Sequence, residues 1–198
     1  MLKNIIKHII LVSKHKWWVF KLCCRVGQPW RGLVHDLSKF SPTEFFESIK
    51  YYQGNRSPIP VARETKGFSE AWLHHKGRNK HHLEYWADSR AKEYAAVVPY
   101  KYAAEMACDK MAASKVYNGK NWTNSSEVDY WMKEKTISIV NPKVDNFLTA
   151  IFEQVKEQGL NKTYTKKNFK ALYKKYCIDD KTKYRYEVKT EWKVREEN

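Results

Sequence analysis

A succession of helix start and stop signals is the feature that most constrains how this chain folds. Ser41-Pro42-Thr43-Glu44 combines a serine N-cap, a proline at the first helical position and a glutamate that can return a hydrogen bond to the cap. Pro99 precedes a segment with helical apolar spacing that stops at Asn118-Gly119, and Asn141-Pro142 opens another. We therefore expect an all-α core. The expected helices cover about 2–25, 42–52, 68–78, 99–118 and 142–158.

Apolar spacing predicts which helix faces are buried. In the first helix, apolar residues at positions 2, 5, 6, 9, 12 and 19 share one face, and His8 and His15 lie seven residues apart near it. In the last helix, one apolar side is formed by Val144, Phe147, Leu148, Ile151, Phe152 and Val155. Residues 53–67 are rich in proline, glycine and polar side chains, which predicts a loop.

Composition divides the chain after residue 158. Residues 1–158 carry most of the helical signals and are expected to form one helical domain. Residues 159–198 are rich in Lys, Tyr and Thr and are expected to form a basic accessory extension. Within it, 166–176 has helical spacing and 183–189 alternates like a strand, so a short helix and a β-hairpin are expected there.

Charge and cysteine usage narrow the class of partner and the compartment. The chain has 37 Lys and Arg against 22 Asp and Glu, a net charge of +15 that attracts phosphate groups on a small molecule or a nucleic acid. The four cysteines form no Cys-x-x-Cys pair, which favours a reducing cytoplasm. Lys7 and His8 interrupt the first apolar run, so we expect no membrane span. The sequence indicates no particular oligomeric state.

A dispersed set of histidines and aspartates predicts a metal site. His35-Asp36 is followed by His74-His75 and His81-His82, with His15 upstream and Asp109 downstream. Imidazole and carboxylate together are ligands that zinc, iron, manganese or nickel accept. The adjacent pair His35-Asp36 can reach one ion if that ion lies over a helix end. On this basis Asp36 is the best candidate for a carboxylate that bridges two ions.

These residues resemble the HD-domain superfamily of metal-dependent phosphohydrolases. His35-Asp36-Leu37-Ser38-Lys39 is similar to its His-Asp-x-x-Lys element, and 107–112 resembles its closing aspartate helix. More closely, the strings His35 to Ser41, His75-x-x-x-Asn79-x-His81-His82-x-Glu84-Tyr85-Trp86 and Glu105-Met106-x-x-Asp109 resemble an uncharacterised HD-like family common in phages and bacteria. The resemblance covers about 10–155 and implies an HD-domain-like helical bundle.

The resemblance also implies roles for individual residues. One or two divalent ions (Mn, Zn, Ni, Mg or Fe) would be bound by four core ligands, His15, His35, Asp36 and Asp109, together with one or two of the three downstream histidines. Asp36 and Lys39 would belong to the catalytic centre. Lys39 would face the substrate phosphate or brace Asp36. If the protein hydrolyses phosphate esters, we expect Lys39 and nearby Arg31 or Arg78 to neutralise the developing charge. The implied metal ligands are His15, His35, Asp36, His75, His81, His82 and Asp109. The spacing from His75 to His82 is shorter than in many two-metal members, which leaves open which of these histidines bind.

Several neighbouring residues are weaker candidates. Glu84 and Glu105 are candidates for carboxylates that orient ligating imidazoles, although a glutamate in such a position is more often just a helix-surface charge. His74 is expected in solvent or behind the ligands, and His8 is expected to be structural. Aromatic side chains that could stack on a base, or simply form core and groove wall, are Tyr51, Tyr52, Trp72, Tyr85 and Trp86.

Three functions fit these observations. The leading hypothesis is hydrolysis of a phosphate ester or anhydride, in a nucleotide or short oligonucleotide, by metal-activated water. The second is an HD-type di-iron oxygenase, which the extra histidines favour. The third is a non-enzymatic basic module that binds nucleic acid or a partner through the Lys-rich segment 162–195, with a steep salt dependence.

Overall fold

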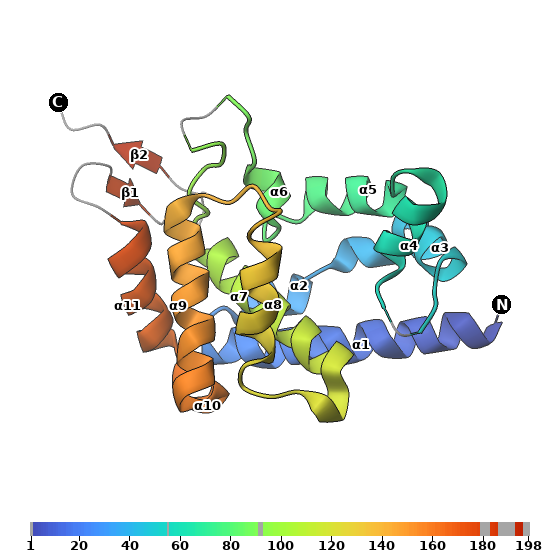
Figure 1. Cartoon of the computed structure of the whole chain (residues 1–198), viewed down its shortest axis with the longest axis horizontal. Helices are drawn as coiled ribbons and strands as arrows, with labels where there is room; N and C mark the ends of the chain where they lie inside the picture. The colour runs from blue at the N-terminus through green and yellow to red at the C-terminus, as the bar shows by residue number, and fades with distance from the viewer. Residues whose placement is uncertain (1, 55, 91–92, 179–182, 186–192, 196–198) are drawn as a thin grey trace.

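The computed structural model describes residues 2–54, 56–90, 93–178, 183–185 and 193–195, and in these ranges it is mostly helical (Figure 1). The α-helices are α1 Leu2–Arg25, α2 Pro29–Val34, α3 Pro42–Lys50, α4 Pro58–Lys66, α5 Glu70–Arg78, α6 Leu83–Trp86, α7 Tyr100–Asn118, α8 Ser126–Glu134, α9 Pro142–Gln158, α10 Leu160–Thr163 and α11 Lys166–Cys177. Two 3₁₀ turns, η1 Leu37–Phe40 and η2 Gly119–Asn121, and the strands β1 Lys183–Arg185 and β2 Lys193–Arg195 complete them. None of the described helices has the length and apolar character to cross a bilayer.

Helices α1 and α7 form the centre of the molecule. Helix α1 packs mainly against α2 and α7, and α7 buries most of its residues because α8, α9 and α11 surround it (Figure 1). The predicted buried face of α1 is wrong at its N-terminal end, where Ile6 and Ile9 are 51% and 40% exposed. The buried face instead continues from His8 through Val12 and His15, so histidines occupy core positions.

Helices α3, α4 and α5 form a second layer beside the N-terminal half of α1 (Figure 1). The predicted loop over 53–67 is wrong, because α4 occupies most of it. Ser57 caps this helix by accepting a hydrogen bond from Ile59 N, and Pro58 stands at its first position. Gly67, with φ +84°, ends it. The prolines and the glycine are therefore helix boundaries.

The C-terminal helices belong to the same core as the rest of the chain. Tyr164, Phe169 and Tyr173 pack in one cluster with α7 and α9, and the Tyr164 hydroxyl donates to Ala107 O at 2.8 Å. The division proposed after residue 158 therefore corresponds to no break in the core. The predicted helix at 166–176 is present as α11.

The expected β-hairpin is described only in part. Lys183–Arg185 pairs antiparallel with Lys193–Arg195, with Tyr184 opposite Val194. The remainder of the predicted strand, 186–189, lies outside the described residues. Helix α8, which the sequence analysis did not predict, begins at Ser126 after a Ser125 cap position.

Candidate metal centre

A sharp turn after α2 brings two neighbouring side chains into the interior. His35 is extended (φ −53°, ψ 128°) and Asp36 is left-handed (φ +52°), a conformation that aspartate adopts more readily than most residues. A Cβ on Gly32 would lie 2.8 Å from Cys23 Cβ, so glycine permits the close approach of α2 to α1 that fixes this turn. Because α2 ends at Val34, the His35 and Asp36 side chains can both point into one site, where both are buried.

One group of side chains converges on Asp36 Oδ2 and Asp109 Oδ1. His15 Nε2 of α1 lies 2.9 Å from Asp109 Oδ1 of α7. His35 Nε2 lies 3.4 Å from the same oxygen and 3.2 Å from Asp36 Oδ2. We call His15, His35, Asp36 and Asp109 the first ligand set, since each offers an atom within 4.8 Å of the others.

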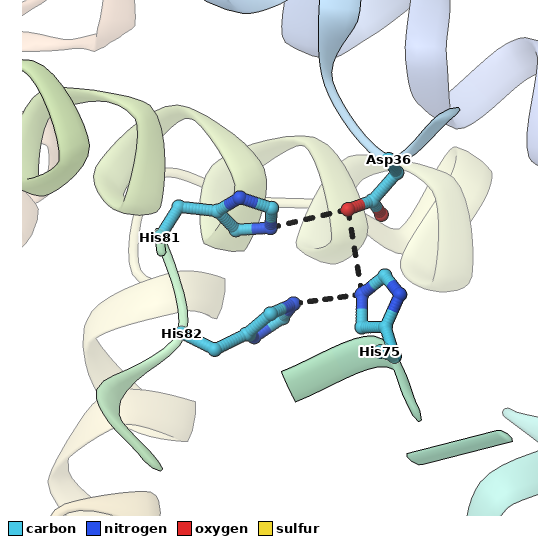
Figure 2. A group of neighbouring side chains, drawn as sticks. All are labelled: Asp36, His75, His81 and His82. Carbon is cyan, nitrogen blue, oxygen red and sulfur yellow. Dashed lines mark hydrogen bonds and ion pairs between the residues drawn. The ribbon is translucent and has the colours of Figure 1, made fainter. Parts of the chain in front are cut away.

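A second group converges on the other oxygen of Asp36 (Figure 2). His75 Nε2 of α5 lies 3.3 Å from Asp36 Oδ1, and His81 Nε2 lies 3.2 Å from it. His82 Nε2 lies 2.8 Å from His75 Nε2. Asp36, His75, His81 and His82 form the second ligand set. Asp36 is thus common to both sets, with one oxygen toward each.

These distances fit ligand atoms around divalent ions. An ion about 2.1 Å from each ligand spaces neighbouring ligand atoms about 3.0 Å apart in an octahedron and about 3.4 Å apart in a tetrahedron. Four buried atoms of the described residues form no well-directed hydrogen bond, although each histidine nitrogen among them has a carboxylate oxygen within 3.2 Å. They are His15 Nε2, His35 Nε2, His81 Nε2 and Asp36 Oδ1. Buried polar atoms that converge without bonding to one another are what a metal site requires.

Glu105 of α7 lies behind the first imidazoles and is buried. Its Oε1 lies 3.1 Å from His35 Nδ1 and 3.3 Å from His81 Nδ1, and its Oε2 accepts from Arg31 Nε at 2.7 Å. A hydrogen bond from His35 Nδ1 to this carboxylate leaves the Nε2 lone pair for a metal. The prediction that Glu105 orients imidazoles agrees with this contact.

Glu44 of α3 holds an imidazole of the second set in the same way, a role that the sequence did not predict. Its Oε2 lies 2.7 Å from His75 Nδ1 and its Oε1 lies 2.6 Å from His74 Nδ1. The sequence predicted that Glu44 would bond back to the N-cap Ser41, whose side chain does accept from Glu44 N. The capping pattern therefore concealed the second use of this side chain. Asn79 Nδ2 adds a hydrogen bond to Ser38 Oγ, beside His75.

The acids of the centre are held ionised. Burial would raise the pKa of Asp36, but the His35 and Lys39 charges hold it well below its usual value. Asp109 has a lowered pKa because the His15 and His35 contacts outweigh its burial. Burial is likewise outweighed at Glu105, where the His81 charge and the His35 hydrogen bond lower the pKa to about 2. Three ionised carboxylates in one buried centre require positive charge there.

The predicted cationic residues have different surroundings. Lys39 Nζ lies 2.7 Å from Asp36 Oδ2, so it braces the shared carboxylate. Arg31 is bound to Glu105 behind the centre, and Arg78 contacts His74 O at 3.4 Å on the surface. Neither arginine lines the cavities that adjoin the site. Arg31 thus holds Glu105 behind the centre, and the prediction that Arg31 or Arg78 neutralises charge on a substrate phosphate stays a prediction.

Two cavities open on the centre. The larger, of about 530 Å³, reaches His81, His82 and Asp109 and continues along α7. The smaller, of about 210 Å³, reaches His15, Asp36, His75 and Lys39. Trp72, His82, Asp109 and Tyr117 line both, so the ligand sets lie where the two cavities adjoin. A small molecule in these adjoining cavities can therefore lie beside residues of both ligand sets.

The remaining candidates lie around the centre. His8 is buried beside Phe45 and Tyr52, and it belongs to neither ligand set. Glu84 is exposed and lines the larger cavity, and it forms no hydrogen bond or ion pair with an imidazole of the described residues. Of the five aromatic candidates, Trp72 lines the cavities. The others, which line neither, are Tyr51, Tyr52, Tyr85 and Trp86.

All seven predicted ligands therefore meet in one buried centre, and His74 lies outside both sets. Comparison with known proteins gives a family without an assigned activity. No curated protein and no solved structure matches the chain. A family model described as a family of unknown function (DUF5662) matches residues 4–154, a segment that contains all seven side chains. The chain thus belongs to the family of unknown function DUF5662.

Proposed function

We propose that this protein is a metal-dependent phosphohydrolase that cleaves a phosphate ester or anhydride, in a nucleotide or short oligonucleotide. The observation that carries the proposal is the shared Asp36: its two oxygens face two ligand sets that adjoin one pair of cavities. A carboxylate between two ions is a recurring arrangement in enzymes that hydrolyse phosphate esters. The resemblance of this region to HD-domain phosphohydrolases supports the same chemistry.

The side chains have distinct tasks in this proposal. The first set would hold one ion and the second set another, and the ions would supply activated water and neutralise charge on the phosphoryl group. Lys39 fixes Asp36 between the sets. Glu105 and Glu44 hold His35 and His75 with Nε2 toward the centre. Trp72 and Tyr117 contribute aromatic side chains to the walls of both cavities.

Neighbouring histidines of α5 provide a matched test of this activity. His74 and His75 both contact Glu44, but His75 alone belongs to a ligand set. With Mn²⁺, Ni²⁺ or Zn²⁺ supplied, wild-type protein is expected to hydrolyse bis(p-nitrophenyl) phosphate or nucleoside phosphates. His75→Ala is expected to lower kcat at least about 100-fold, because it loses a ligand of the second set. His74→Ala is expected to stay within about fivefold of wild type. Equal activity of both variants would contradict the proposal.

A di-iron oxygenase is the second candidate. The three imidazole nitrogens of the second set, from His75, His81 and His82, form a nitrogen-rich site of a kind that iron accepts. Protein purified with two irons, a visible absorption band and oxygen uptake with an organic substrate would favour this function. Colourless protein that hydrolyses phosphate esters with Mn²⁺ or Zn²⁺ would favour the phosphohydrolase.

A further inference from the structure

The larger cavity reaches the metal centre at Asp109, and its wall also includes a buried carboxyl group, which marks what we call the Glu127 end of the cavity. Glu127 of α8 lines this cavity and is 1% exposed, yet its Oε1 has no hydrogen-bond partner among the described residues. Ser114 of α7 lines the same end, is buried, and also has an unpartnered hydroxyl. Ser114 lies close enough to lower the pKa of Glu127 as a hydrogen-bonding neighbour, yet Glu127 Oε1 and Ser114 Oγ each lack a hydrogen bond of good geometry among the described residues. Such unsatisfied groups are costly unless a ligand completes them.

The Glu127 carboxyl is neutral near pH 7. Burial, opposed by the Lys110 charge and reinforced by the Glu134 and Asp109 carboxylates, raises its pKa to about 9. A neutral carboxyl offers one O–H donor and one carbonyl acceptor side by side. This pair matches a ligand that presents an adjacent acceptor and donor, as a lactam edge does.

The cavity has the length and the walls for an organic phosphate. Asp109 and Ser114 are five residues apart on α7, which is about 7.5 Å along the helix axis. Trp72, Tyr117 and Tyr130 contribute aromatic side chains to its wall. A planar ring could therefore lie between the metal centre and Glu127.

We propose that the Ser114 and Glu127 end of this cavity binds an uncharged hydrogen-bonding ring of the substrate whose phosphate lies at the metal centre, an inference that rests on the proposed function. Glu127 is thereby a specificity-determining residue. It favours phosphate esters of a ring with a lactam-type edge and disfavours substrates with a second phosphate at this end.

The charges that line this end support an uncharged group. Lys110 Nζ is paired with Glu134 Oε2 at 2.6 Å, and Arg56 is paired with Glu64. Arg56 and Lys110 are the only lysine or arginine residues among the described residues that line the larger cavity, and both already have carboxylate partners. A second phosphate here would meet two carboxyl groups and no unpaired lysine or arginine among the lining residues.

Binding by two variants of Glu127 tests this assignment. Metal-loaded protein would be titrated with non-hydrolysed phosphonate analogues of uridine 5′-monophosphate, ribose 5-phosphate and ribose 1,5-bisphosphate, and with inorganic phosphate. Wild type is expected to bind the uridine compound at least about tenfold more tightly than either ribose compound. Glu127→Leu should lose that preference and keep its metal content and its affinity for ribose 5-phosphate. Glu127→Gln retains a donor and an acceptor, so its preference should stay within about threefold of wild type.

Glu157→Leu removes an exposed glutamate of α9 and serves as the control for loss of a carboxylate. An unchanged uridine preference in Glu127→Leu would overturn the inference, as would a wild type that binds inorganic phosphate but shows no uridine preference. In both cases the proposed function would stand. If metal-loaded wild type binds none of these compounds, inorganic phosphate included, the proposed function fails and this inference fails with it.

Discussion

Replacing Asp36 by asparagine is expected to remove both ions and to lower phosphohydrolysis at least about 1000-fold, because one side chain serves both ligand sets. Asparagine keeps the shape of the side chain but loses the charge that two cations require. Elemental analysis of purified wild type and variant, at matched concentration and without chelator, measures the metal content directly. The kcat of each protein gives the second readout.

Single-set variants and a surface control sharpen this result. His15→Ala should lose the ion of the first set and His82→Ala the ion of the second, so each should retain about one equivalent. Asp129→Asn, on the exposed side of α8, should retain the full complement. Circular dichroism that shows unchanged helix content separates loss of metal from loss of fold. Full metal content in Asp36→Asn would contradict the shared-carboxylate centre.

Removing the metal is expected to lower the melting temperature by about 10 °C. The ligands come from α1, the turn after α2, α5, residues 81–82 and α7, so an ion links segments that are far apart in the sequence. Metal at about 1000 times its Kd stabilises a folded protein by about 4 kcal/mol, and each kcal/mol corresponds to about 2–4 °C at this chain length. Thermal unfolding of protein treated with chelator, with and without restored Mn²⁺ or Zn²⁺, measures the difference.

The stabilisation that bound metal gives to the folded protein should increase as pH rises. In the metal-free protein, burial and the His35 charge lower the pKa of His81, but Glu105 and Asp36 outweigh them and raise it to about 9. A histidine whose folded pKa exceeds its unfolded value of about 6.5 stabilises the fold below pH 6.5 and loses that contribution as pH rises through 9. Metal displaces this proton, so its binding strengthens over the same range. A difference in melting temperature that narrows between pH 6.5 and 9 would contradict this assignment.

Helix boundaries followed from the sequence where single residues dictate local geometry. Pro99, the Asn118-Gly119 stop and Asn141-Pro142 each mark a boundary in the structure. Helix α4 was missed because residues such as Ser57, Pro58 and Gly67 are typical of loops. In the structure these residues mark the two ends of the helix. Local signals thus located most helices, but composition alone misassigned one.

The candidate ligands could be predicted because their residue types are unusual together, whereas the groups behind them could not. His35, Asp36 and Asp109 stand out in the sequence as a mixed imidazole and carboxylate set. Glu44 and Glu127 are ordinary helix glutamates in the sequence, and their buried positions arise from tertiary packing of α3 and α8 against other helices. Arg31 lies close to the His35-Asp36 pair in the sequence, but in the structure it binds Glu105 behind the site. Proximity in sequence therefore did not indicate its contact.

Anomalous X-ray diffraction from crystals grown with Mn²⁺ or Zn²⁺ tests the central claim most directly. The two-set centre predicts two anomalous peaks, one bound by His15, His35 and Asp109 and the other by His75, His81 and His82, with one oxygen of Asp36 on each. Each ligand atom should lie about 2.0–2.3 Å from its peak. No peak beside Asp36, or a single peak bound by residues of one set alone, would contradict it.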